Sequence, residues 1–178
     1  EKINDLRNVI AAYSNLAIVK RSLGDFEKAI DYLNLILDKS LSQKLSAKIY
    51  SDLAENYLLL NDSDNANKFL KISNSISKDS KILGKNYQTQ GNINLSNRKF
   101  EEAENYFIKA MPLVKEVYGN NNRELGKLYN KVAQCKMGVA LYKEAILNYR
   151  LALKTILPKN NELVGDDMVN KNSLYPEN

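Results

Sequence analysis

The sequence contains no histidine and no tryptophan, and it has one cysteine, Cys135. Without histidine there is no imidazole to serve as a general base or metal ligand, and no Ser-His or Cys-His pair for nucleophilic catalysis. A single cysteine forms no disulfide within the chain and no thiolate pair for a metal. We therefore expect no catalytic, cofactor-binding or metal-binding residue, and we expect that the chain is not an enzyme. Cys135 is expected to be a small buried hydrophobic residue.

Long apolar runs and runs of one charge sign are also missing. No stretch approaches the roughly 20 apolar residues that a membrane span requires. The 26 basic and 21 acidic residues give a net charge of +5, and the lysines are dispersed among aspartates and glutamates. A dedicated nucleic-acid surface needs clustered basic residues, so nucleic acid is an unlikely partner. No membrane partner is expected, and the predicted location is cytoplasmic.

The chain does contain residues that recur at a fixed spacing. Four alanines are separated by 37, 37 and 42 residues: Ala29, Ala66, Ala103 and Ala145. Sixteen residues before each alanine stands a tyrosine: Tyr13, Tyr50, Tyr87 and Tyr129. Twelve residues before each stands a small residue: Ala17, Ala54, Gly91 and Ala133. Several residue types that share one period indicate internal repeats, and repeats of this length are typical of stacked helix pairs.

The first repeat shows how each unit is built. Tyr13, Leu16 and Ala17 have the spacing of one helical face, and Phe26, Ala29, Ile30 and Leu33 repeat that spacing further on. Between them, Gly24 suits a left-handed helix cap, and Asp25 is able to accept hydrogen bonds from the next helix. Each unit is therefore predicted to be a first helix, a tight turn and a second helix.

This pattern resembles the tetratricopeptide repeat family, and the long period is similar to that of kinesin light chains. The resemblance implies an all-α fold, a right-handed superhelical solenoid of antiparallel helix pairs. The expected array spans 1–159, with repeats at about 10–43, 47–80, 84–117 and 126–159. Residues 160–178 are expected to form a capping helix or the start of a truncated fifth repeat.

Two departures from the family pattern carry expectations of their own. Asn61, Asp62 and Ser63 replace the usual Gly-Asp-aromatic turn, so the turn of the second repeat is expected to be looser. Pro112 falls inside the second helix of the third repeat, where it is expected to bend the helix or end its regular bonding early.

The resemblance places ligand-facing residues on the first helix of each repeat, where they line a concave groove. Twelve residues occupy these positions in repeats two to four: Lys48, Ser51, Glu55, Leu58, Lys85, Gln88, Asn92, Leu95, Lys127, Asn130, Gln134 and Met137. They form a lysine row, an amide row and an apolar row. Amides both donate and accept hydrogen bonds, so they suit a peptide backbone, whereas lysines favour acidic side chains or a C-terminal carboxylate. An ordinary solvated face is the alternative interpretation.

We therefore expect a non-catalytic protein–protein interaction scaffold that binds a peptide or partner segment in the groove. The alternative is the regulatory or sensor array of a larger multidomain enzyme, because the tail after Leu157 resembles the joint that precedes a CHAT peptidase domain in bacterial proteins. A nucleic-acid-responsive regulator is a third possibility. Apolar residues near 150–170 also predict self-association through the C-terminal end.

Overall fold

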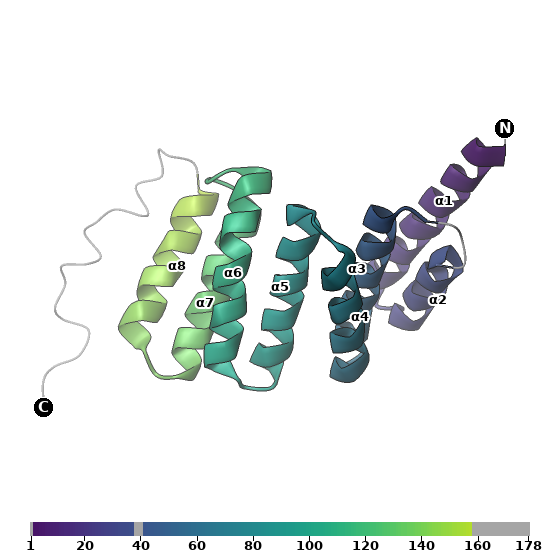
Figure 1. Ribbon diagram of the computed structural model, residues 1–178. Helices are drawn as coiled ribbons and strands as arrows, with labels where there is room; N and C mark the ends of the chain where they lie inside the picture. The colour runs from purple at the N-terminus through teal and green to yellow at the C-terminus, as the bar shows by residue number, and fades with distance from the viewer. Residues whose placement is uncertain (1, 38–40, 158–178) are drawn as a thin grey trace, which may run out of the picture.

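The computed structural model describes residues 2–37 and 41–157, with side chains from residue 6 onward. Within these ranges the chain forms eight α-helices and no strand (Figure 1). Their bounds are α1 Lys2–Ser22, α2 Phe26–Leu37, α3 Gln43–Leu59, α4 Ser63–Ile76, α5 Ser80–Ser96, α6 Phe100–Tyr118, α7 Arg123–Gly138 and α8 Tyr142–Ile156. The predicted capping helix or fifth repeat at residues 160–178 lies outside the described residues.

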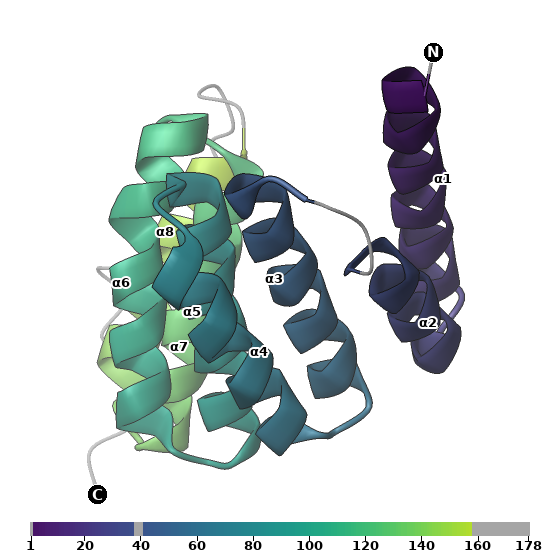
Figure 2. The same ribbon diagram turned by 45° about the vertical axis from the view of Figure 1, so that its right-hand side comes forward.

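The helices are arranged as four pairs in a row. Each odd-numbered helix packs most closely on the even-numbered helix that follows it, and α2 and α6 also contact the first helix of the next pair. Figure 1 shows the row running from α1 at one end to α8 at the other, and in the turned view of Figure 2 α8 lies behind α6. This arrangement confirms the predicted all-α solenoid of helix pairs.

The recurring small residues lie where the two helices of a pair cross. Ala29, Ala66, Ala103 and Ala145 are all 0% exposed. In the third pair the contact is closer still, because a Cβ atom on Gly91 would lie 2.5 Å from Cε1 of Phe107. No side chain fits there without moving that ring. The recurring small residues therefore mark the positions where the backbones of the two helices of a pair approach closely.

The four turns within the pairs share one geometry. The residues at their centres have positive φ angles: Gly24 at 78°, Asn61 at 60°, Arg98 at 57° and Ala140 at 60°. In each turn the next N–H donates to the carbonyl five residues earlier, as from Asp62 to Tyr57 at 2.9 Å, which is the Schellman cap. The expectation of a looser second turn is therefore wrong. Asn61 adopts the left-handed conformation readily, so the glycine is not needed there.

Pro112 does not end its helix. α6 continues from Phe100 to Tyr118, six residues beyond the proline, so the expectation of an early end to its bonding is wrong. Pro112 itself is exposed. The removed N–H therefore lies on the solvent side of the helix, where water replaces the lost hydrogen bond.

Candidate peptide-binding groove

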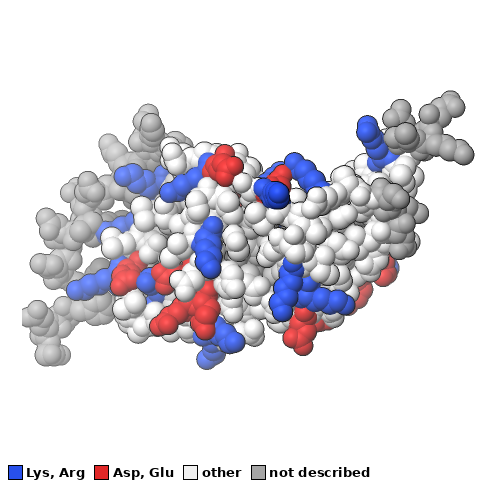
Figure 3. All heavy atoms as spheres, in the orientation of Figure 1, with Lys and Arg blue, Asp and Glu red and all other residues white. Residues whose placement is uncertain are grey.

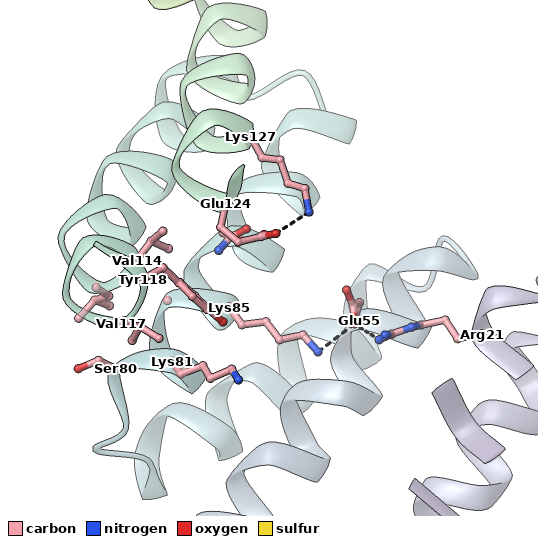
Figure 4. Close-up of a pocket in the computed structure, with 13 residues that line it drawn as sticks. Arg21, Glu55, Ser80, Lys81, Lys85, Val114, Val117, Tyr118, Glu124 and Lys127 are labelled. Atoms are coloured by element: carbon pink, nitrogen blue, oxygen red, sulfur yellow. Dashed lines mark hydrogen bonds and ion pairs between the residues drawn. The ribbon is translucent and has the colours of Figure 1, made fainter. Parts of the chain in front are cut away.

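A network of ion pairs joins the first helices of three consecutive pairs. Arg21 of α1 forms an ion pair with Glu55 of α3. From the other side, Nζ of Lys85 on α5 lies 2.9 Å from the Glu55 carboxylate and 2.5 Å from that of Asp52. Lys48 lies 3.4 Å from the second oxygen of Asp52. Figure 4 shows Arg21 and Lys85 converging on Glu55 from opposite directions.

The charges in this network support one another. Burial by itself would raise the pKa of Asp52, but Lys85 and Lys48 outweigh it and hold the pKa below its usual value. Burial would likewise lower the pKa of Lys85, but Asp52 and Glu55 raise it above its usual value. Asp52 and Lys85 are therefore both charged at neutral pH.

Two hollows flank this network. One has a volume of about 320 Å³ and extends from Arg21 and Glu55 past α5 to Tyr118 at the end of α6 and to Lys127 on α7. Its wall combines charged groups with the apolar side chains of Leu113, Val114 and Val117. It therefore offers both ion pairing and apolar contact to one ligand segment.

The other hollow, of about 550 Å³, lies between the first turns of α3 and α5. Its lining contains four lysines and two aspartates: Lys44, Lys48, Lys81, Lys85, Asp52 and Asp79. Nζ of Lys44 lies 2.6 Å from the Asp79 carboxylate. Lys81 instead lies over the Tyr118 ring, 5.9 Å from its centroid. With two more cations than anions in its wall, this hollow favours an anionic group.

The structure brings together half of the twelve residues that the sequence singled out. Six of them line the two hollows: Lys48, Ser51, Glu55, Lys85, Gln88 and Lys127. The predicted lysine row therefore lies at the hollows, but its charge is largely paired, since Lys127 also contacts Glu124 at 2.8 Å. The remaining six lie outside both hollows: Leu58, Asn92, Leu95, Asn130, Gln134 and Met137.

Several predicted ligand-facing residues are less accessible than a groove residue should be. Ser51 is 1% exposed, and its hydroxyl has no hydrogen-bond partner among the described residues. The side-chain oxygen of Asn92 is also buried without a partner. Leu58 and Leu95 pack partly against the core, whereas Met137 is 47% exposed. The amide and apolar rows are therefore not continuous surfaces.

Sequence reasoning missed the residues that complete the hollows. Asp52 could have been found, because it follows Lys48 by four residues and this spacing places both side chains on one helical face. Lys44, Asp79 and Tyr118 carry no such signal. They reach the hollows only because α3, α5 and α6 are neighbours in space.

The described residues contain no group of three or more potential metal ligands. Cys135 is buried, and desolvation, with a smaller contribution from Glu104, raises the pKa of its thiol to about 11. The thiol is therefore protonated at neutral pH and unreactive as a nucleophile.

In the described part of the chain, no helix is both long and apolar enough to span a membrane. On the face shown in Figure 3, basic and acidic side chains lie beside each other in small groups rather than in one patch of a single sign.

Comparison with known proteins gives the following matches. Residues 10–38 match the model of the tetratricopeptide repeat. The chain superposes on a Signal Transduction ATPase with Numerous Domains (STAND) protein with a tetratricopeptide repeat sensor from Pyrococcus horikoshii, with a TM-score of 0.74 and 23% identity. That match covers 82% of this chain and 23% of the other, so this chain spans about a quarter of that protein.

A second solved structure, BtubC (BKLC) from P. vanneervenii, matches with a TM-score of 0.74 and 24% identity over 89% of this chain and 68% of that one. At such identities the likeness concerns the fold alone. No curated protein sequence matches the chain.

Proposed function

We propose that this chain, which carries a tetratricopeptide repeat and folds as a solenoid of helix pairs, is a non-catalytic interaction module that binds a segment of a partner protein along α3 and α5. Tetratricopeptide repeats generally mediate protein interactions. The observation that carries the proposal is the pair of hollows on either side of the Arg21–Glu55–Lys85–Asp52 network. In this proposal the module acts in the cytoplasm.

The chemistry of the hollows indicates which segment fits. Acidic groups of the partner, either side chains or a C-terminal carboxylate, would enter the hollow between α3 and α5, where lysines outnumber aspartates. Leu45 and Ile82 in the same wall would contact an apolar side chain beside that acidic group. Because Lys48 and Lys85 are already paired with Asp52, and Lys44 with Asp79, Lys81 is the cation best placed to make the new contact.

A substitution at Lys81 tests this assignment. Peptides selected from a random display library against the whole chain would be measured for affinity to the wild type and to Lys81→Ala. We expect binding about fivefold weaker in the variant, the loss of roughly 1 kcal/mol for one partly exposed charge contact. The matched control is Lys109→Ala on α6, because Lys109 also lies over a tyrosine ring, 5.4 Å from the centroid of Tyr106, but lines neither hollow.

The result would contradict the proposal if the selected peptides bound both variants as tightly as the wild type. Peptides that lost affinity only with Lys109→Ala would place binding on α6. Loss with Lys81→Ala alone would support binding at the hollow between α3 and α5.

A second candidate function is that of a regulatory or sensor array within a larger protein. It is favoured by the fold shared with the STAND protein whose tetratricopeptide repeats form a sensor. The two functions differ in where the ligand segment resides. Capture with the whole chain, followed by identification of the bound species, would return a separate protein for the first and a domain encoded in the same gene for the second.

A further inference from the structure

The outer face of α1, continued by Leu23 directly after the helix, carries an apolar stripe that the described residues leave exposed. Its members are spaced three and four residues apart: Val9, Ala12, Leu16, Val19 and Leu23. The four larger ones are 41%, 41%, 53% and 73% exposed in chain order. This spacing is typical of the apolar face by which one helix packs on another. We call these five residues the α1 stripe.

The same repeat positions are buried in the later pairs. In α7, the counterparts of the first four stripe residues are Leu125, Leu128, Val132 and Cys135, each at most 4% exposed. They form one core cluster with Phe107, Ala110 and Val114 of the preceding helix, α6. In α3, the counterparts Ile49 and Leu53 are 0% exposed and pack with residues of α2. The α1 stripe is therefore the surface by which a first helix packs on the pair before it.

The last described helix has an exposed stripe of the complementary kind. Tyr142, Ile146, Tyr149, Leu153 and Ile156 are spaced four and three residues apart, and they are 57%, 51%, 36%, 49% and 52% exposed. We call them the α8 stripe. Three of their counterparts on α6 contact the next pair as well as their own: Phe107 and Val114 are 0% and 3% exposed in the cluster shared with α7, and the Phe100 ring lies against Gly138. A fourth counterpart, Glu104, forms an ion pair with Lys136 of α7.

We propose that a second copy of this chain stacks head to tail, with the α8 stripe of one copy against the α1 stripe of the next. The α6/α7 junction inside each copy is the template, because it joins the same two kinds of face. The helices that carry the two stripes, α1 and α8, lie at opposite ends of the row (Figure 1). Such a contact does not close on itself, so it extends the solenoid from copy to copy.

A symmetric dimer fits the structure less well. It would place two α8 stripes together, or two α1 stripes, whereas the junctions between the described helices all join the second helix of one pair to the first helix of the next. Within the described residues the outer faces of α1 and α8 are apolar, whereas the terminal face of a repeat array is usually polar. The inference is independent of the proposed groove function and gives the self-association expected from the sequence a specific surface.

Sedimentation of two charged variants tests the arrangement. Val19→Glu with Leu23→Glu disables the α1 stripe, and Ile146→Glu with Leu153→Glu disables the α8 stripe. All four residues are about half exposed or more, so the substitutions leave the helices folded, which circular dichroism verifies. We expect the wild type to grow beyond a dimer with concentration, and each variant alone to remain a monomer. An equimolar mixture of the two variants should form a one-to-one dimer, because it retains one intact stripe of each kind.

Leu35→Glu with Ile108→Glu is the matched control, since these residues are 45% and 48% exposed on α2 and α6, outside both stripes. It should associate as the wild type does. A wild type that is monomeric at every accessible concentration would overturn the proposal. So would an α1-stripe variant that still dimerises by itself, because that result requires a symmetric contact between α8 stripes.

Discussion

The junction between the second and third pairs is polar, whereas the junction between the third and fourth pairs is apolar. Across the polar junction, Nδ2 of Asn86 donates to the Ser73 and Asn74 oxygens, each at 2.8 Å, and the Ser73 hydroxyl in turn donates to the Ala47 carbonyl within the second pair at 2.8 Å. Nε2 of Gln90 donates to Asn67 at 2.9 Å. The side-chain oxygen of Asn86 is buried without a partner among the described residues.

At the repeat positions of Asn86 and Gln90, the later junction has Leu128 and Val132, which are 1% and 4% exposed. A hydrogen bond adds only about 1 kcal/mol net, since water satisfies the same groups in the unfolded chain. A buried leucine or valine contributes about 1.5–3 kcal/mol. The comparison therefore indicates that the polar junction is the weaker one, and that the chain opens there first when it is destabilised.

The weaker junction also coincides with the candidate groove. The hollow of about 550 Å³ lies between α3 and α5, on either side of this junction. A ligand segment that contacts both helices would hold the second and third pairs together. Binding and the stability of the polar junction are therefore expected to be coupled.

The substitution expected to lower the free energy of unfolding most lies in the apolar junction. Leu128→Ala removes a side chain that is 1% exposed and leaves a cavity against α6, so we expect unfolding to require about 2–5 kcal/mol less free energy. Urea unfolding followed by circular dichroism measures this change. A loss below about 1 kcal/mol would show that the α6/α7 junction is no more stabilising than the polar one.

Asn86→Ala, at the same repeat position in the polar junction, should have a smaller effect. The substitution removes two hydrogen bonds from Nδ2 but also removes the unpartnered oxygen, so we expect a loss of about 1 kcal/mol. The same urea measurement compares it directly with Leu128→Ala. Equal losses in the two variants would contradict the contrast between the junctions.

Much of the fold was predictable because close packing leaves a trace in sequence. Ala66 or Ala103 is small because a neighbouring helix touches its Cβ atom, and that constraint recurs with every pair. The turns were predictable from residue type only in part. Asn61 adopts the backbone conformation of Gly24 readily, whereas Arg98 and Ala140 adopt it because the helices on both sides impose it.

The candidate site was predictable only as a set of helix faces. The resemblance to the tetratricopeptide repeat predicted Lys48, Glu55 and Lys85 on the ligand-facing side of their helices, but the ion pairs that they form depend on distances between helices. Burial of Ser51 and of the Asn92 oxygen depends in the same way on neighbours that are distant in sequence. The residues on a single helix face therefore predict neither the ion pairs between helices nor the burial of these side chains.

Asp52→Asn tests whether charge pairs hold α3 to α5 at the polar junction. The pKa of Asp52 is lowered in the folded chain, so its ionisation stabilises the fold above the unfolded pKa, near 4, and this contribution is lost as the pH falls through the lower folded value. We expect the variant to lose about 1 kcal/mol of unfolding free energy at neutral pH, and this loss should disappear in acid and become smaller at high salt. The control, Glu124→Gln, affects an exposed pair within α7 and should be nearly neutral. An effect of Asp52→Asn that is independent of pH would show that its packing matters and its charge does not.

The smallest expected effect concerns the turn that precedes α8, in the pair that has the apolar junction. Ala140 has a φ of 60°, a conformation that an alanine adopts at a cost and a glycine adopts freely. Ala140→Gly should therefore raise the free energy of unfolding by about 0.5–1 kcal/mol, after the greater flexibility of glycine in the unfolded chain is deducted.

The reciprocal control is Gly24→Ala in the first pair, where φ is 78° and a Cβ atom would meet nothing within 4 Å. That variant should lose about the same amount through backbone strain alone. If urea unfolding gives changes in the free energy of unfolding of opposite sign for the two variants, the four turns share one backbone conformation that different residues adopt. A destabilised Ala140→Gly would mean that the turn of the fourth pair relaxes in solution, and that packing on α7 sets the position of α8.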